Sequence, residues 1–192
     1  MAVMPQQSDR IAELIRGLDQ ATSVADPGVI CQRVKRLLSE MVLVDDRFLP
    51  GEFLEPTPDR YARRLLHKDP AGRYSVVIMV WDRGQGTPLH DHAGAWCVEC
   101  VYRGRIRIES YDRTSPVEIE PIRFEAAGVL FAGPAEAGHL IPPHEYHRIE
   151  NAETTPAVTI HVYSGEMTWC NAFQPLPGGG FRREHRPLSY SA

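Results

Sequence analysis

The stretch that decides the fold is residues 74–111, YSVVIMVWDRGQGTPLHDHAGAWCVECVYRGRIRIESY. Its apolar runs are rich in β-branched and aromatic residues, and turns that contain glycine or proline separate them. Short strands between frequent turns are typical of a β-sandwich or barrel. The runs that we predict to be strands are residues 74–81, 96–102, 105–111, 128–131, 147–151 and 157–163. The sequence therefore predicts a mainly β fold.

The first third of the chain has helical periodicity instead. Ser8 can cap a helix with apolar residues at helical spacing, and Asp26-Pro27 opens a second one. Thr57-Pro58-Asp59 predicts the start of a third, ending near Lys68. The tail from Pro175 contains three consecutive glycines and predicts a coil. We expect a single domain made of a helical part (1–70), a β-barrel (71–170) and a C-terminal coil (171–192).

Composition narrows the classes of partner. The 192 residues are 43% hydrophobic and carry a formal net charge of −4, with no clustered basic surface for nucleic acid or lipid headgroups. No run approaches the 18 or so apolar residues of a spanning helix, and the N-terminal residues lack the features of a signal peptide. We expect a cytoplasmic protein whose partners are small molecules. Its oligomeric state is not determined by the sequence, and a monomer is the expectation.

Three histidines predict a metal site. His90 and His92 lie two positions apart on an extended segment, so their imidazoles point to the same side, roughly 6.6 Å apart along the strand. His147, from a later run, can reach the same ion from a neighbouring strand. Three neutral imidazoles leave a divalent ion its full charge, which suits an anionic substrate such as a thiolate. Asp91 should face the opposite side, and His139 and His144 should lie outside the ligand set.

The spacing of these residues resembles the cupin superfamily. Gly84, His90, His92 and Gly104 fall at the intervals of the first cupin motif, and Pro142, His147 and Asn151 at those of the second. Where the first motif usually has a glutamate ligand, this chain has Cys97, and where the second usually has a glycine it has His144. Glu99 lies two residues beyond the usual glutamate position, and we expect it not to bind the metal.

Within the cupins, a set of three histidines resembles the thiol dioxygenases, above all cysteine dioxygenase type I. The resemblance runs from about residue 61 to residue 170. It implies a jelly-roll β-barrel or sandwich with the N-terminal helices packed on it, and Fe(II) held by His90, His92 and His147.

The resemblance also assigns residues to the substrate. Tyr61 and Arg63 match the segment that supplies a phenol and a guanidinium to the substrate carboxylate, and a planar guanidinium suits bidentate binding. Cys170 matches a cysteine that lines the pocket. The alternative for Arg63 is a surface charge beside Arg60 and Arg64.

Two further features follow from the resemblance. Thr159, His161 and Tyr163 alternate on one strand and share a face, and the family uses a hydroxyl, an imidazole and a phenol there as a hydrogen-bonded relay. Ordinary core packing is the alternative. Cys97 matches the cysteine that some members join to the tyrosine in a thioether, here Cys97 to Tyr163. Its alternative is a small buried thiol.

The function implied is a non-haem Fe(II) dioxygenase that inserts both atoms of O2 into the sulfur of L-cysteine, giving cysteine sulfinate in cysteine catabolism. A dioxygenase of another thiol acid, 3-mercaptopropionate or mercaptosuccinate, is the nearest alternative. A non-catalytic metal-binding cupin, or a cupin isomerase that uses zinc or manganese, comes from a different class.

Overall fold

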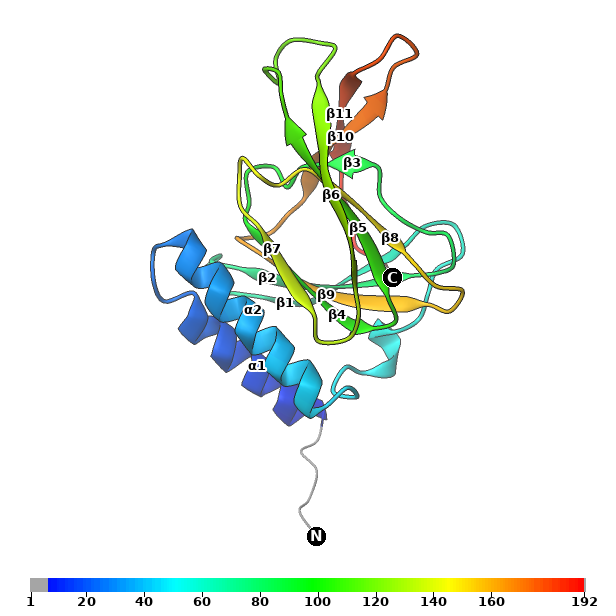
Figure 1. Ribbon diagram of the computed structural model, residues 1–192. Helices are drawn as coiled ribbons and strands as arrows, with labels where there is room; N and C mark the ends of the chain where they lie inside the picture. The colour runs from blue at the N-terminus through cyan, green and yellow to red at the C-terminus, as the bar shows by residue number, and fades with distance from the viewer. Residues whose placement is uncertain (1–6, 192) are drawn as a thin grey trace.

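The computed structural model describes residues 7–191 and contains two α-helices, one 3-10 turn and eleven strands in two antiparallel sheets (Figure 1). The strand orders are β1-β2-β9-β4-β7 in one sheet and β11-β10-β3-β8-β5-β6 in the other. The strands are β1 (Ala62–Lys68), β2 (Ser75–Trp81), β3 (Leu89–His90), β4 (Cys97–Arg103), β5 (Ile106–Arg113), β6 (Phe124–Ala132), β7 (Ala137–Leu140), β8 (His147–Asn151), β9 (Ala157–Tyr163), β10 (Trp169–Pro175) and β11 (Phe181–Pro187). The predicted jelly-roll sandwich with N-terminal helices is confirmed.

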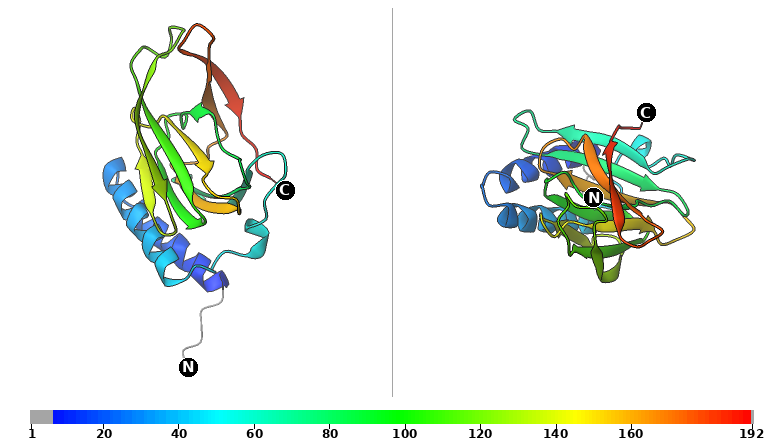
Figure 2. Two further views of the ribbon diagram at one scale, coloured as in Figure 1. Left: turned by 45° about the vertical axis from the view of Figure 1, so that its right-hand side comes forward. Right: turned by 90° about the horizontal axis from the view of Figure 1, so that it is seen from above.

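The helices cover the outer face of the five-stranded sheet (Figures 1 and 2). They are α1 (Gln7–Ala21) and α2 (Pro27–Val44), followed by the 3-10 turn η1 (Gly51–Phe53). The Asp26 side chain accepts a hydrogen bond from the Val29 amide at 2.8 Å, which caps α2, and Pro27 occupies its first turn. Ser8 lies inside α1 and does not cap it. No helix within residues 7–191 combines the length and apolar character needed to cross a bilayer.

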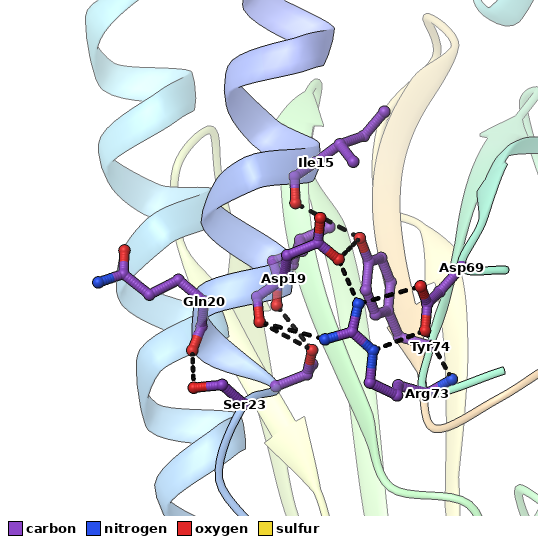
Figure 3. Close-up of polar contacts among 9 residues, drawn as sticks. Ile15, Asp19, Gln20, Ser23, Asp69, Arg73 and Tyr74 are labelled. Carbon is purple, nitrogen blue, oxygen red and sulfur yellow. Dashed lines mark hydrogen bonds and ion pairs between the residues drawn. The ribbon is translucent and has the colours of Figure 1, made fainter. Parts of the chain in front are cut away.

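A polar cluster fastens α1 to the turn between β1 and β2 (Figure 3). The Tyr74 hydroxyl donates to the Asp19 carboxylate at 3.1 Å, and the Arg73 guanidinium contacts both Asp19 and Asp69. The Arg73 guanidinium holds the pKa of Asp69 well below its usual range. The cluster therefore fixes the end of α1 against the sheet that carries half of the site.

The alternation of side chains along β9 separates two cores. Val158, Ile160 and Val162 face the helices, while Tyr163 belongs to the core between the sheets. Thr159 and His161 are buried and have the same parity as Tyr163, so their side chains enter the space between the sheets. The same rule divides β4, where Val98 and Cys100 face the helices and Cys97 and Val101 face inward.

Two predictions from local sequence are wrong. Residues 57–68 do not form a helix, because residues 62–68 are strand β1, which pairs with β2 from Ala62↔Val80 to Lys68↔Ser75. The C-terminal segment is not a coil, because β11 pairs with β10 along its whole length and Gly178–Gly180 lie in the turn between them. In both cases pairing with a distant or neighbouring strand outweighs the local signal.

The turn between β4 and β5 requires a glycine at position 104. Its φ is +79°, and an added Cβ would lie 2.9 Å from the Cα of Ala157. Gly72 has a similar φ of +71° but open space around it.

We predict that Gly72→Ala lowers the free energy of unfolding by about 1–2 kcal/mol from the backbone conformation alone. Gly104→Ala should cost about 1–3 kcal/mol more, because it also crowds β9. Equal losses in thermal or urea unfolding would contradict the requirement for close approach.

Candidate metal centre

Three imidazoles meet between the two sheets. His90 ends β3 and is the cross-strand partner of His147, which begins β8, while His92 lies in the loop after β3. The ring centroids are 4.5 Å apart for His90 and His147, 5.1 Å for His92 and His147, and 5.2 Å for His90 and His92. One nitrogen from each ring lies within 4.8 Å of the other two. The structure thus brings together the three predicted ligands.

Hydrogen bonds orient two of these rings. His90 Nδ1 lies 3.1 Å from the Pro88 carbonyl oxygen, and His147 Nδ1 lies 3.1 Å from the Glu145 carbonyl oxygen. A carbonyl accepts only, so each Nδ1 carries the hydrogen and each Nε2 keeps its lone pair. Fixing the outer nitrogen in this way is the usual second-sphere support of a metal-binding histidine.

Two of the three rings have buried nitrogens without a hydrogen bond. His147 Nε2 and both ring nitrogens of His92 lack a hydrogen bond among residues 7–191. Burial lowers the pKa of His90 to about 3 and that of His92 well below its usual value, which favours the neutral imidazoles that bind metals. Burial also lowers the pKa of His147, but the adjacent Glu99 carboxylate raises it more, and the net pKa lies above the usual value. Unpaired buried nitrogens around one point are expensive unless an ion occupies it, so the residues present fit a divalent cation.

A hydrogen-bonded chain runs along β9 beside the imidazoles. The Trp81 indole donates to the Thr159 hydroxyl at 2.9 Å, and Thr159 Oγ1 lies 2.7 Å from His161 Nε2. His161 Nδ1 is 3.3 Å from the Tyr163 hydroxyl. The indole can only donate, so the Thr159 oxygen accepts from Trp81, and it also contacts His161 Nε2. The three residues predicted as a relay are therefore in contact.

The two predicted carboxylate-binding residues flank the first residue of β1, Ala62. Tyr61 stacks on Trp81 with ring centroids 4.6 Å apart. Arg63 is only 4% exposed, so it is not the surface charge of the alternative interpretation. Its Nη2 donates to the Met167 carbonyl at 2.6 Å, and its guanidinium lies 4.8 Å from the Tyr190 ring centroid. Among residues 7–191 its Nε has no hydrogen-bond partner, and no ion pair involves it.

One small cavity connects these groups. Its lining includes Tyr61, Arg63, His90, His161, Tyr163 and Cys170. One predicted metal ligand (His90), the predicted substrate-binding residues and two of the relay residues (His161 and Tyr163) therefore line a shared space. Cys97 is buried on β4 as the cross-strand partner of Tyr163.

Glu99 is the residue that the sequence interpretation missed. Its carboxylate lies inside the site, with Oε1 3.4 Å from His147 Nε2 and 3.3 Å from His161 Nδ1, and the residue is 8% exposed. Burial raises the pKa of Glu99, but the adjacent imidazoles of His147 and His161 lower it more, and the net value is well below the usual range. The alternation of β4 carried the signal, because Glu99 has the same parity as the inward Cys97.

Comparison with known proteins identifies the family of the chain. The family model for cysteine dioxygenase type I matches residues 51–175. The chain belongs to the cysteine dioxygenase type I family. Cysteine dioxygenase type 1 of Rattus norvegicus is 28% identical over 120 residues, which are 62% of this chain and 58% of that protein. The Homo sapiens protein is 27% identical over the same shares.

The family match covers all of the predicted site. It includes the three histidines, Arg63 and the β9 chain, whereas the chain spans less than two thirds of the length of these relatives. A crystal structure from Thermus thermophilus aligns with a TM-score of 0.47 and 16% identity, over 59% of this chain and 91% of that one. That score is too low to add to the assignment of the fold, which follows from the strand order.

A bound divalent ion should stabilise the fold. At a free concentration 100 times the dissociation constant, the gain is about 2.7 kcal/mol, which raises the melting temperature by roughly 5–10 °C for a chain of this size. We predict that His147→Ala abolishes this rise. His144→Ala, at an exposed side chain, should retain it and serves as the matched control. A rise of the same size in His147→Ala, measured by scanning calorimetry with and without metal, would place the ion elsewhere.

Proposed function

We propose that this protein is an Fe(II)-dependent thiol dioxygenase that converts L-cysteine to cysteine sulfinate. The observation that carries the proposal is the buried guanidinium of Arg63, which opens onto the same cavity as His90 and Tyr163. A buried cation without an anionic partner is costly, and a substrate carboxylate would provide that partner. Membership of the cysteine dioxygenase type I family supports the thiol as the reacting group.

The reaction balances without another reductant. One thiol and one molecule of O2 give one sulfinic acid, the S–H and O–O bonds break, and two S–O bonds form. The sulfur loses four electrons and the two oxygen atoms accept them. We therefore expect no requirement for 2-oxoglutarate or a nicotinamide.

Different side chains would bind the substrate carboxylate and donate a hydrogen bond to the reacting atoms. The planar Arg63 guanidinium can bind the substrate carboxylate through two parallel hydrogen bonds, with the Tyr61 phenol beside it. Burial keeps the pKa of Tyr163 well above its usual value, so its hydroxyl stays protonated and can donate a hydrogen bond to the reacting atoms. The Thr159 hydroxyl contacts His161, and His161 in turn contacts the Tyr163 hydroxyl, so the pair orients that phenol.

Iron fits the donor set of His90, His92 and His147. When bound, it supplies the means for triplet dioxygen to react with a spin-paired thiol. The protein supplies position, because carboxylate and sulfur of the substrate are held at two fixed points. All four cysteines are free thiols in the structure. The cytoplasmic location of the protein stays a prediction.

The direct test is oxygen uptake by the Fe(II)-loaded protein with L-cysteine, 3-mercaptopropionate and mercaptosuccinate offered separately. We expect the highest kcat/KM with L-cysteine, one O2 consumed per thiol, and the sulfinate identified by mass. Preference for another thiol acid would overturn the substrate and retain the reaction, since Arg63 can bind any of the three carboxylates. No uptake with any thiol would favour a non-catalytic metal-binding cupin.

Arg63 provides a sharper test of substrate binding. We predict that Arg63→Leu lowers kcat/KM for L-cysteine about 10- to 100-fold, because a charge-assisted hydrogen bond contributes about 1.5–3 kcal/mol. Cysteamine, which lacks the carboxylate, should be oxidised equally by the variant and the wild type. Arg60→Leu, at an exposed neighbour, is the matched control. Equal losses for both substrates would mean that Arg63 does not bind the carboxylate.

We also propose a thioether between Cys97 and Tyr163. The two are directly opposite on β4 and β9, where cross-strand Cβ atoms lie about 4.5–5.5 Å apart. Bonding Sγ to a carbon of the ring removes the thiol hydrogen and one ring hydrogen, and O2 accepts the two electrons. Burial raises the pKa of the Cys97 thiol well above its usual value, so the starting state is the neutral thiol.

Intact-protein mass measures this step. After turnover with Fe(II) and thiol, we expect the wild type to lose the mass of two hydrogen atoms, while Cys97→Ser and Tyr163→Phe keep their masses. A wild-type mass that does not change would leave Cys97 as an ordinary buried thiol.

A further inference from the structure

Residues 188–191 lie against the start of β1, beside the cavity that Arg63 lines. The Ser191 backbone N–H donates to the Arg63 carbonyl at 2.7 Å, and the Ser191 hydroxyl accepts the Arg63 backbone N–H at 3.0 Å. The Leu188 backbone N–H donates to the Thr168 carbonyl at 2.7 Å, which fixes the other end of the segment. These three hydrogen bonds hold the segment against the strand that carries Arg63.

The same segment borders the path into the cavity. The cavity at His90 and an outer pocket share three lining residues, which are Tyr61, Arg63 and Leu188. The outer pocket faces solvent, since its lining includes the exposed Arg60. A ligand that enters the cavity from this side therefore passes between β1 and residues 188–191.

Tyr190 covers the guanidinium of Arg63. The Arg63 Cζ atom lies 4.8 Å from the centroid of the Tyr190 ring, which is the distance of a cation–π contact. Nη2 of Arg63 donates to the Met167 carbonyl at 2.6 Å. The ring and the carbonyl together restrict the guanidinium, while its Nε has no hydrogen-bond partner among residues 7–191 and is left for a ligand.

Tyr190 is itself held by a charged pair. Its hydroxyl donates to Glu166 Oε1 at 3.2 Å, and Glu166 also forms an ion pair with Lys68. The hydrogen bond from Lys68 lowers the pKa of Glu166, so this side chain is an ionised acceptor. Burial raises the pKa of Tyr190, so its phenol keeps the hydrogen that it donates. Lys68 and Glu166 therefore fix the ring that lies over Arg63.

An aromatic ring holds an arginine without neutralising it. Within residues 7–191 no carboxylate forms an ion pair with Arg63, and Glu166 is bound to Tyr190 and Lys68. A protein carboxylate at Arg63 would compete with a substrate carboxylate for the same donors. The contact with Tyr190 orients the guanidinium and leaves its charge available.

We infer that Tyr190 is a positioning residue, which holds the Arg63 guanidinium in the orientation that binds the carboxylate of the substrate. The inference rests on the proposed function, because it takes a thiol acid as the ligand. Residues 188–191 lie outside residues 51–175, which the family model matches, so membership of the family does not imply this role.

Thiol binding to the Co(II)-loaded protein without oxygen tests the inference. The absorption of a thiolate bound to the metal reports occupancy, and no turnover occurs. We expect Tyr190→Leu to raise the dissociation constant for L-cysteine about 5- to 30-fold, the change that corresponds to a partly desolvated cation–π contact. Cysteamine, which lacks the carboxylate, should bind equally to the variant and the wild type. Tyr190→Phe retains the ring and should recover most of the loss.

Phe131→Leu is the matched control. The Phe131 ring centroid lies 5.1 Å from Arg105 Cζ, so this variant removes an aromatic contact to an arginine that does not line the cavity. Both dissociation constants should stay at their wild-type values. Equal affinity of Tyr190→Leu and the wild type for L-cysteine would overturn the inference. An equal loss for L-cysteine and cysteamine would also overturn it, because such a loss does not depend on the carboxylate.

The same measurement separates this inference from the proposed function. If the wild type binds L-cysteine more tightly than cysteamine but oxidises no thiol, the proposed reaction is wrong and the comparison with Tyr190→Leu still decides the role of Tyr190. If the wild type binds the two thiols equally, both carboxylate binding by Arg63 and the inference are wrong.

Glu166→Ala replaces Tyr190→Leu if the latter does not fold, as judged by circular dichroism. It removes the acceptor of the Tyr190 hydroxyl and retains the ring. We then expect a smaller loss of affinity, again for L-cysteine and not for cysteamine. No selective loss in Glu166→Ala would overturn the inference.

Discussion

Three imidazole nitrogens directed at one buried point are the constraint on which the rest of the structure depends. Buried nitrogen atoms without hydrogen bonds destabilise a protein, and here two of the three rings are held in place by backbone carbonyls that occupy their outer nitrogens. A cation at its centre would give these nitrogens a partner and remove that cost. The strands, the helices on their outer face and the polar chain of β9 all act to keep that centre dry and fixed.

The sandwich assembles the site from distant parts of the chain. Antiparallel pairing places His90 opposite His147 and Cys97 opposite Tyr163, so the register of two strand pairs sets the positions of four predicted site residues. Because side chains alternate, a shift of one residue in either pair would turn them out of the site. The Arg73 cluster at the base of α1 and the close approach at Gly104 therefore matter for function, since both hold strands of the same sheet.

The sequence predicted the β region well because its runs are apolar, β-branched and separated by turns. It failed at residues 62–68, where arginines and leucines have good helical propensity but pair with β2. It also failed at β11, whose charged residues 182–186 show no hydrophobic alternation and belong to a largely exposed hairpin. In both segments the deciding contact is with another strand, which local propensity does not contain.

The histidines of the site were predicted from their spacing along the chain. The position of Glu99 in the site was missed, because its spacing differs from the usual motif. His90, His92 and His147 fall at recognisable intervals, and the parity of β9 indicated its polar chain. Glu99 departs from the usual motif by two residues, so it was predicted only not to bind the metal. Its position in the site follows from strand parity, which places it on the same face as Cys97. Parity along a strand was the better guide, because a displacement of two residues retains the face.

The most direct test of this account is a crystal structure of the iron-loaded protein with data collected at the iron absorption edge. The account predicts one anomalous peak per chain, about 2.1 Å from a ring nitrogen of each of His90, His92 and His147. A peak at any other place, or an ion bound by fewer than three of these imidazoles, would contradict it.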